Sequence, residues 1–337
     1  MSERVVCDGP YFEDFELGRV YTDAPSLTLT SGHAAAHQAL VADRLRIALD
    51  AELCAAVTGS DRPLAHPNLV CDVAIGQSTE PSQRVLGNLF YRGLVLLAPV
   101  FIGDTLTTST EIVALKQNRT REDGSATGLA VFRIRTANQR GEPVLDFWRC
   151  PMIPLRDGGA DTGHADGFDS IPDQLDPEAL AGSVPGHWDL AAYRERVPGR
   201  HFSDVVPGTV FEVAGRDTVT AAPELARLTL NVAKAHTDAG ATAHGRRLVY
   251  GGQTISIAAA QATRALPNMV TILAWQGCDH LAPIFEGDVL ATDLSVEGAR
   301  GLDREGGLVE LRARVRAERS DGEIVDALDW SFTALMA

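Results

Sequence analysis

The chain has 337 residues, 45% of them hydrophobic, which is enough for two domains of ordinary size. Its formal net charge is −15, so no overall field attracts phosphates, and this argues against general nucleic-acid or anionic-membrane binding. The first residues, MSERVVCDGP, lack an apolar core of the signal-peptide kind, and the longest apolar run, Leu94–Ile102, is about half a membrane span, so a cytoplasmic protein is expected.

Five cysteines are spread along the chain, and no two of them form a Cys-x-x-Cys pair. An odd number without such a pair is not typical of a disulfide framework or of a zinc site. We therefore expect reduced thiols, which agrees with a cytoplasmic location.

The N-terminal part of the chain predicts one helical region followed by a series of strands. A short strand at Ser26–Thr30 comes first, and an Ala-rich helical region follows it. Longer strands are expected at Val85–Tyr91, Asp104–Leu115, Thr127–Ala137 and Pro143–Pro151. One helix followed by long antiparallel strands predicts a sheet wrapped around a buried helix.

A segment rich in Gly, Asp and Pro, residues 156–186, has no apolar period and predicts a linker. A short helix is expected directly after it, at Trp188–Arg196. This helix would lead into the second half of the chain.

The C-terminal part repeats the order of the N-terminal part. A strand at Asp217–Thr220 precedes a helical region, and a helix is expected at Ile255–Ala262. The later strands are expected at Asn268–Gln276, Asp288–Val296, Gly307–Glu318 and Glu323–Leu335. Alternation is clearest in the third of these, where small or apolar residues occupy one face and mainly charged residues the other.

Three pairs of segments recur in the same order and indicate an internal repeat. The pairs are YFEDFELGRV at 11–20 with HFSDVVPGTV at 201–210, LAPVFIGDTL at 97–106 with LAPIFEGDVL at 281–290, and GEPVLD at 141–146 with GEIVDA at 322–327. Their offset drifts slowly from 190 through 184 to 181 residues. We therefore divide the chain into a first copy at 1–157, a linker with a short helix at 158–200, and a second copy at 201–337.

The second copy carries a motif that resembles a known family. Asn231-Val-Ala-Lys-Ala-His236 has the spacing of the Asp-x-Asn-Pro-x-His element of MaoC-type (R)-specific enoyl-CoA hydratases, with Asn in the Asp position. The longer pattern NVAKAHTD…GRRLVYGG is similar to the mesaconyl-CoA hydratase (β-methylmalyl-CoA dehydratase) branch, as are IVALKQN at 112–118 and NQRGEPVLDFWR at 138–149. The chain departs from that branch at Gln253, where the branch usually has His. The resemblance covers most of both copies and implies an α+β double hotdog, with each antiparallel sheet wrapped around a long central helix.

Hydration of an enoyl thioester needs a proton-transfer group, a positioned water and a stabilised thioester oxygen. His236 is the best acid/base candidate because an imidazole titrates near neutral pH. Asn231 cannot accept a proton, but its amide can hold a water, so the proton work falls on His236. Gly252, at the start of the expected helix, could present an N–H to the thioester oxygen. The family has its oxyanion glycine at the matching position.

Each of these residues also has a structural reading. His236 could be a buried structural histidine, Asn231 a helix cap, and Gly251-Gly252 a simple turn. Asp238 either helps His236 or is a surface turn residue, and Tyr250 contacts substrate or only packs.

Coenzyme A would bring phosphates into an acidic protein. Arg246 and Arg247 form the strongest local basic feature near the glycine pair and are candidate ligands for these phosphates. An acyl group with its own carboxylate would also need an arginine, and the sequence does not show which arginine serves which anion.

The first copy is expected to be catalytically degenerate and to shape the acyl-CoA pocket. Aligning His37 with His236 places Gly32 opposite Asn231, and aligning LVCDVA with LVYGGQ places Asp72 opposite Gly251. The first copy would then keep a histidine but lack the amide and the oxyanion glycine.

The resulting prediction is a hydro-lyase that hydrates a short enoyl-CoA reversibly, with mesaconyl-CoA and β-methylmalyl-CoA as the favoured pair. The alternatives are an (R)-specific hydratase for another acyl chain, a hotdog acyl-CoA thioesterase, and a non-catalytic acyl-CoA-binding protein. We expect no metal or other cofactor, since His33 and His37 lack a third ligand nearby, and we expect a possible homodimer.

Overall fold

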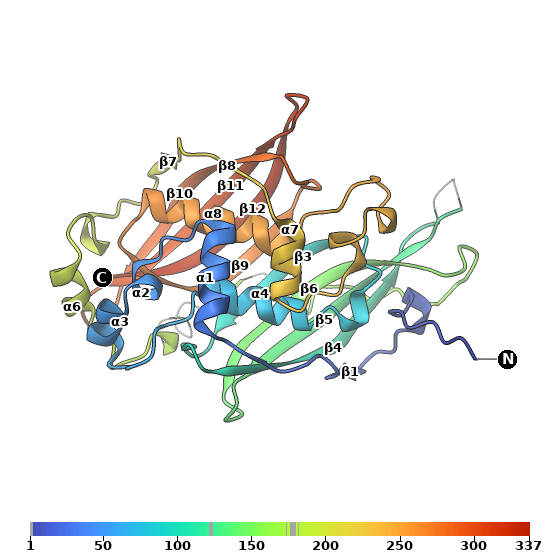
Figure 1. Ribbon diagram of the computed structural model, residues 1–337, viewed down its shortest axis with the longest axis horizontal. Helices are drawn as coiled ribbons and strands as arrows, with labels where there is room; N and C mark the ends of the chain where they lie inside the picture. The colour runs from blue at the N-terminus through green and yellow to red at the C-terminus, as the bar shows by residue number, and fades with distance from the viewer. Residues whose placement is uncertain (1–2, 121–123, 173, 176–179, 181) are drawn as a thin grey trace.

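The computed structural model describes residues 3–337 apart from 121–123, 173, 176–179 and 181. Its strands form one twelve-stranded antiparallel sheet with the order β1-β4-β5-β6-β3-β9-β12-β11-β10-β7, while β2 pairs with β4 and β8 with β10 (Figure 1). The strands are β1 Val20–Tyr21, β2 Leu27–Thr28, β3 Gly87–Leu96, β4 Thr105–Gln117, β5 Thr127–Ala137, β6 Pro143–Pro154, β7 Val210–Glu212, β8 Asp217–Thr218, β9 Met269–His280, β10 Val289–Gly301, β11 Gly307–Glu318 and β12 Ile324–Met336. The two halves of the sheet join where β3 pairs with β9.

The long strands lie where alternation predicts them, and β5 and β11 have the predicted bounds. On β11, the apolar positions Val309, Leu311, Ala313 and Val315 are buried. Leu308, the second residue of the strand, is also buried, although it shares the face of the charged residues. The period of two therefore predicted which face of the sheet meets the core.

Helices cover one face of this sheet (Figure 1). They are α1 Ser31–Val41, α2 Arg46–Leu49, α3 Ala51–Thr58, α4 Pro67–Gln77, α6 Leu190–Arg196, α7 Ala222–Leu228 and α8 Gly251–Ala265, with 3-10 turns η1 Phe12–Asp14, η2 Glu80–Ser82, η3 Phe202–Asp204, η4 Lys234–His236 and η5 Ala239–Ala241. The central helices of the two copies, α4 and α8, are almost entirely buried. Helix α8 begins at Gly251, four residues before its predicted start, because the glycine pair forms its first turn.

Matching hydrogen bonds confirm the repeat. Asp104 accepts a hydrogen bond from the Phe101 N–H, and Asp288 accepts one from the Phe285 N–H, each at 2.9 Å. These residues belong to the repeated LAPxFxGD segment, so the same sequence builds the same turn in both copies.

The central helices align in a register that differs from the expected one. Gln77 and Gln261 each donate a hydrogen bond of 3.0 Å to the repeated LAPxFxGDxL segment. In each copy the acceptor is the backbone carbonyl of the last leucine of that segment. Because the two glutamines are equivalent, Asp72 is the counterpart of Ser256. The expected alignment of Asp72 with Gly251 is wrong.

The loops before the central helices correct the alignment of the histidines. Asp43 Oδ1 accepts the N–H two residues ahead at 2.8 Å, and Asn231 Oδ1 does the same at 3.0 Å. In both copies the preceding residue has a positive φ of 60°. This shared turn makes Asp43 the counterpart of Asn231, and it makes Ala48, rather than His37, the counterpart of His236.

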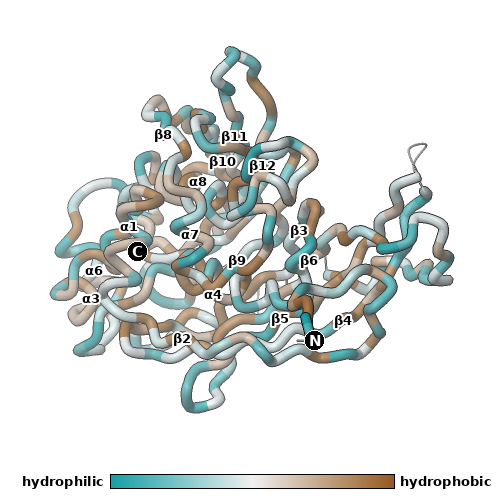
Figure 2. Tube along the Cα trace, turned by 45° about the vertical axis from the view of Figure 1, so that its right-hand side comes forward, coloured by the Kyte–Doolittle hydropathy of each residue, from teal (hydrophilic) through white to brown (hydrophobic). Residues whose placement is uncertain are grey.

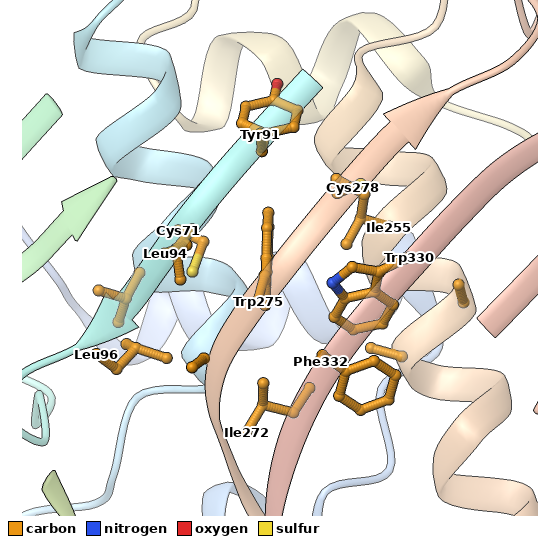
Figure 3. Close-up of a cluster of buried hydrophobic side chains, with 14 of the residues drawn as sticks. Cys71, Tyr91, Leu94, Leu96, Ile255, Ile272, Trp275, Cys278, Trp330 and Phe332 are labelled. Atoms are coloured by element: carbon orange, nitrogen blue, oxygen red, sulfur yellow. The ribbon is translucent and has the colours of Figure 1, made fainter. Parts of the chain in front are cut away.

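An aromatic row fills the middle of the core. The rings of Trp330 and Phe332 stack with centroids 3.9 Å apart, and Trp275 meets Trp330 edge-on at 5.5 Å (Figure 3). Tyr91 continues the row at 6.0 Å from Trp275, across the seam between β3 and β9. Figure 2 shows hydrophobic chain along β9 and α4 in the interior and hydrophilic chain mainly in the outer loops. The two copies therefore share one core.

The segment 158–200 joins the copies and contains the expected short helix as α6. Lys116 of β4 pairs with Ala165 in an isolated bridge, and Trp188 is buried. Residues 173, 176–179 and 181 of the expected linker lie outside the described residues. In the described part of the chain, no helix is both long and apolar enough to cross a bilayer.

Candidate active site

A cavity of about 310 Å³ lies between the two copies. Mostly apolar walls surround a small set of polar side chains, which is the usual composition of a small-molecule site. The first copy contributes Thr79, Asn88, Tyr91 and Arg149, and the second contributes Asn231, His236, His244, Tyr250, Thr254 and His280.

His236 lies at the end of η4 and is only 8% exposed. Its Nδ1 donates a hydrogen bond to the carbonyl oxygen of Leu248 at 2.8 Å. Because a carbonyl can only accept, this bond fixes the proton on Nδ1 and leaves the lone pair on Nε2. Burial lowers the pKa of His236 to about 4, so the ring is neutral at pH 7 and Nε2 can accept a proton.

Asn231 follows α7 and lines the same cavity. Its Oδ1 accepts the N–H of Ala233 at 3.0 Å, so the side chain does stabilise a turn, as its structural reading implies. Its Nδ2 has no hydrogen-bond partner among the described residues, and this amide group remains available to a ligand or water.

The glycine pair begins α8, whose first N–H groups have no partner within the helix. Gly251 lines the cavity, and a Cβ there would lie 2.5 Å from Nε2 of His280. Gly252, the expected oxyanion residue, is buried and is not among the residues that line the cavity, and a Cβ there would lie 2.0 Å from Oδ1 of Asp72. Both positions therefore require glycine for packing, and both present backbone N–H groups at the positive end of a helix.

The other expected site residues are divided between the cavity and the surface. Tyr250 lines the cavity with its ring 5.5 Å from that of His236, and its hydroxyl donates to the Asp72 carbonyl at 3.0 Å. Asp238 is exposed and accepts the Gly240 N–H at 2.9 Å, which is the role of a turn residue.

Arg246 and Arg247 are also outside the cavity. Arg246 lies over the Phe285 ring, 4.4 Å from its centroid, and donates to the Glu286 carbonyl. Arg247 forms an ion pair of 2.6 Å with the Glu286 carboxylate. Both guanidinium groups are exposed and already have partners.

His280, at the end of β9, is a cavity residue that the sequence did not single out. Its Nε2 is buried and has no hydrogen-bond partner among the described residues. Burial lowers its pKa to about 4, so the cavity contains a second neutral imidazole. Comparison of the two copies could have drawn attention to this residue, because the residue before LAPxFxGD is Leu96 in the first copy and His280 in the second.

Arg149, on β6, is the second residue that the sequence did not single out. It is 3% exposed, and its Nη2 donates to the Ser78 carbonyl and to Ser82 Oγ, both at 2.7 Å. Its burial could have been predicted from the alternation of the strand, since it shares a face with the buried residues Phe147 and Ile153.

The first copy lacks the chemistry of the second at the corresponding positions. Ala48 stands where the second copy has His236, and Pro67, which has no N–H, begins α4 as Gly251 begins α8. His66 Nε2 instead donates a hydrogen bond of 2.9 Å to the Asp43 carboxylate in the interior.

Comparison with known proteins identifies the family. The sequence profile described as mesaconyl-CoA hydratase matches residues 3–266. The chain belongs to the mesaconyl-CoA hydratase family. It is 30% identical over 320 residues to mesaconyl-CoA hydratase from Cereibacter sphaeroides, covering 90% of this chain and 88% of that protein. It is 29% identical over 291 residues to β-methylmalyl-CoA dehydratase from Chloroflexus aurantiacus, covering 84% of this chain and 80% of that protein.

A solved structure supports the fold of this family member. A conserved hypothetical protein from Mycobacterium tuberculosis, described as having a double hotdog fold, is 47% identical, with a TM-score of 0.88 over 98% of this chain and 99% of that chain. The expected α+β double hotdog is therefore confirmed. The expected enzyme class, a hydro-lyase of the mesaconyl-CoA hydratase family, is confirmed by the named relatives.

Proposed function

We propose that this protein hydrates mesaconyl-CoA reversibly to β-methylmalyl-CoA. The main support for this proposal is the state of His236. Its hydrogen bond to Leu248 fixes the tautomer, so that a basic Nε2 remains in the cavity that Asn231 also lines. The names of the relatives at 30% and 29% identity support this choice of substrate pair.

In the hydration direction, Asn231 holds a water with its amide while the oxygen of that water attacks Cβ of the enoyl thioester. His236 Nε2 takes one proton from the water as the C–O bond forms. The C=C electron pair moves toward the thioester, and the N–H groups of Gly252 and Gly251 stabilise the resulting oxyanion. The imidazolium then returns its proton to Cα, so one water has been added and the enzyme is regenerated.

The first copy, with Ala48 and Pro67 at the corresponding positions, acts in this scheme as a wall of the site. Because hydration transfers no electrons, we infer that the reaction needs no redox cofactor. Location in the cytoplasm and assembly into a homodimer stay predictions of the sequence.

The test follows the absorbance of the enoyl thioester after purified protein is mixed with mesaconyl-CoA or, separately, crotonyl-CoA. We expect wild type to consume the mesaconyl-CoA band and the His236→Ala variant to leave it unchanged. Consumption of the crotonyl-CoA band alone would keep the mechanism and replace the substrate. Release of free thiol without a double-bond reaction would indicate a thioesterase, and binding without turnover would indicate an acyl-CoA-binding protein.

A further inference from the structure

We infer that Arg149 is the specificity-determining residue of the cavity and pairs with a free carboxylate on the acyl group of the substrate. This inference rests on the proposed function and adds a role to a residue outside the catalytic motif. In mesaconyl-CoA the free carboxylate is bonded to Cβ, the carbon that receives the hydroxyl group.

Arg149 is a buried cation whose neighbours are neutral. Its Nη2 donates to the Ser78 carbonyl and to Ser82 Oγ, and its Nε is buried without a partner in the described residues. Its guanidinium carbon lies 5.2 Å from the centroid of the Phe132 ring. None of the carboxylates in the described chain lies within ion-pair distance of it.

The other strand arginines show the usual arrangement. Arg133 of β5 pairs with Asp146 at 2.8 Å, and Arg312 of β11 forms the equivalent pair with Asp329 at 2.5 Å. These groups are partly exposed, yet each has a carboxylate. Arg149 is far more deeply buried, and a guanidinium stays charged in proteins, so an unpaired one there is costly. An anionic ligand in the cavity would supply the missing counter-charge.

In the second copy, the position equivalent to Arg149 belongs to the hydrophobic core. Arg149 pairs with Tyr91 across β6 and β3, and Phe332 pairs with Trp275 at the corresponding place across β12 and β9. Phe332 is stacked in the aromatic row at the centre of Figure 3. The first copy thus has a cation where the second has an aromatic ring, at a place where the cation lines the cavity.

The burial of Arg149 indicates which anion it can reach. Coenzyme A phosphates are strongly hydrated and would remain near solvent, whereas Arg149 is 3% exposed. The thioester oxygen gains its charge only during the reaction and already has the start of α8. A carboxylate on the acyl chain is permanently charged and enters the cavity with the chain. Its capture would also fix the adjacent Cβ with respect to Asn231 and His236.

The experiment compares wild type with Arg149→Met, which keeps side-chain length and removes the charge. Arg133→Met is the matched control, because it removes a strand arginine outside the cavity. Binding is measured by calorimetry with succinyl-CoA and butyryl-CoA, which differ in having a carboxylate or a methyl group on Cβ. Turnover is measured with mesaconyl-CoA and crotonyl-CoA.

We expect wild type and Arg133→Met to bind succinyl-CoA more tightly than butyryl-CoA, and Arg149→Met to lose about 10²-fold in succinyl-CoA affinity while butyryl-CoA affinity changes little. The kcat/KM for mesaconyl-CoA should fall by a similar factor, and that for crotonyl-CoA should not. Equal losses with both members of a pair would mean that Arg149 only supports the fold, and the inference would be overturned while the proposed function stood.

The binding arm separates the two proposals. If wild type prefers succinyl-CoA, Arg149→Met removes that preference, and wild type does not hydrate mesaconyl-CoA, the proposed substrate is wrong and Arg149 remains the carboxylate site. If wild type shows no preference for succinyl-CoA, the assignment of Arg149 is wrong whatever the turnover result.

Discussion

Ser256 of α8 donates a hydrogen bond of 3.0 Å to Asp72 of α4, its own counterpart in the other copy. The two central helices therefore meet at equivalent positions, with one carboxylate and one hydroxyl. Asp72 is buried and also pairs with His37 at 3.1 Å. This contact links the helix that begins with the glycine pair to the copy that has Ala48 in place of His236.

Asp72→Ala should lower the free energy of unfolding by about 3 kcal/mol, because His37 and Ser256 would lose their shared buried partner. The exposed Asp303 provides a matched control, and Asp303→Ala should change stability by less than about 0.5 kcal/mol. Urea unfolding of both variants measures the difference. Similar values for the two would show that the buried pair contributes nothing.

Gly252→Ala should destabilise the protein by about 1–3 kcal/mol, because the added methyl group would overlap Asp72 and the Tyr250 ring. Gly186 has nothing within 4 Å of the position of an added Cβ, so Gly186→Ala is the control. Thermal unfolding of the two variants checks this. An unchanged midpoint for Gly252→Ala would mean that α4 and α8 pack less closely than described.

The buried imidazoles predict a loss of stability in acid. Burial lowers the pKa values of His236 and His280 from 6.5 to about 4. Between these values the unfolded chain binds protons that the folded chain does not, so stability falls as pH falls from 6.5 toward 4 and is unaffected above 6.5. Each histidine should contribute a loss of about 2 kcal/mol between pH 7 and pH 5.

His280→Leu, which installs the residue found at this place in the first copy, should remove its share of that loss. Urea unfolding at pH 7 and pH 5 measures it, with the exposed His187→Leu as control. The prediction fails if His280→Leu and wild type lose the same stability between the two pH values.

His236→Gln should reduce kcat by about 10²–10⁴-fold, because glutamine can keep the bond to the Leu248 carbonyl but cannot accept a proton. In wild type, kcat limited by His236 should stay level from pH 7 to pH 5 and fall near pH 4, where the imidazole becomes protonated. An acid limb near pH 6.5 would show that His236 is solvated or is not the base.

Asn231→Asp should move that acid limb to higher pH, because a carboxylate in the same cavity favours the imidazolium form of His236. The pH dependence of kcat for the variant, compared with wild type, measures the shift. A limb that stays in place would mean that Asn231 and His236 do not face the same ligand. Asn231→Ala is the control for loss of the amide alone.

Much of the fold could be predicted from the sequence because its signals are local. The alternation in β5 and β11 fixed their bounds, and the repeated LAPxFxGD segment predicted equivalent turns in both copies. The register between the copies was harder, because α1 has 11 residues and α7 has 7, so the histidines cannot be aligned by spacing alone.

The candidate site was predictable only where its residues are close in sequence. Asn231, His236 and Gly251 lie within one short stretch and meet in the cavity. Arg149 and His280 come from separate strands, and only folding of the sheet brings them there. Each is visible in the sequence as an exception to a pattern. Arg149 is a charged residue on an apolar strand face, and His280 replaces a leucine of the repeat. Neither exception predicts that the two residues share a cavity.

The pairing of β3 with β9 joins two non-identical halves within one polypeptide. In an assembly of identical chains, a single coding change would alter every wall and every catalytic loop at once. Here a mutation of Arg149 alters one wall of the cavity and leaves the sequence of the loop that contains His236 unchanged. With the roles that we propose for Arg149 and His236, acyl-chain selection and proton transfer can therefore be mutated separately, one in each half.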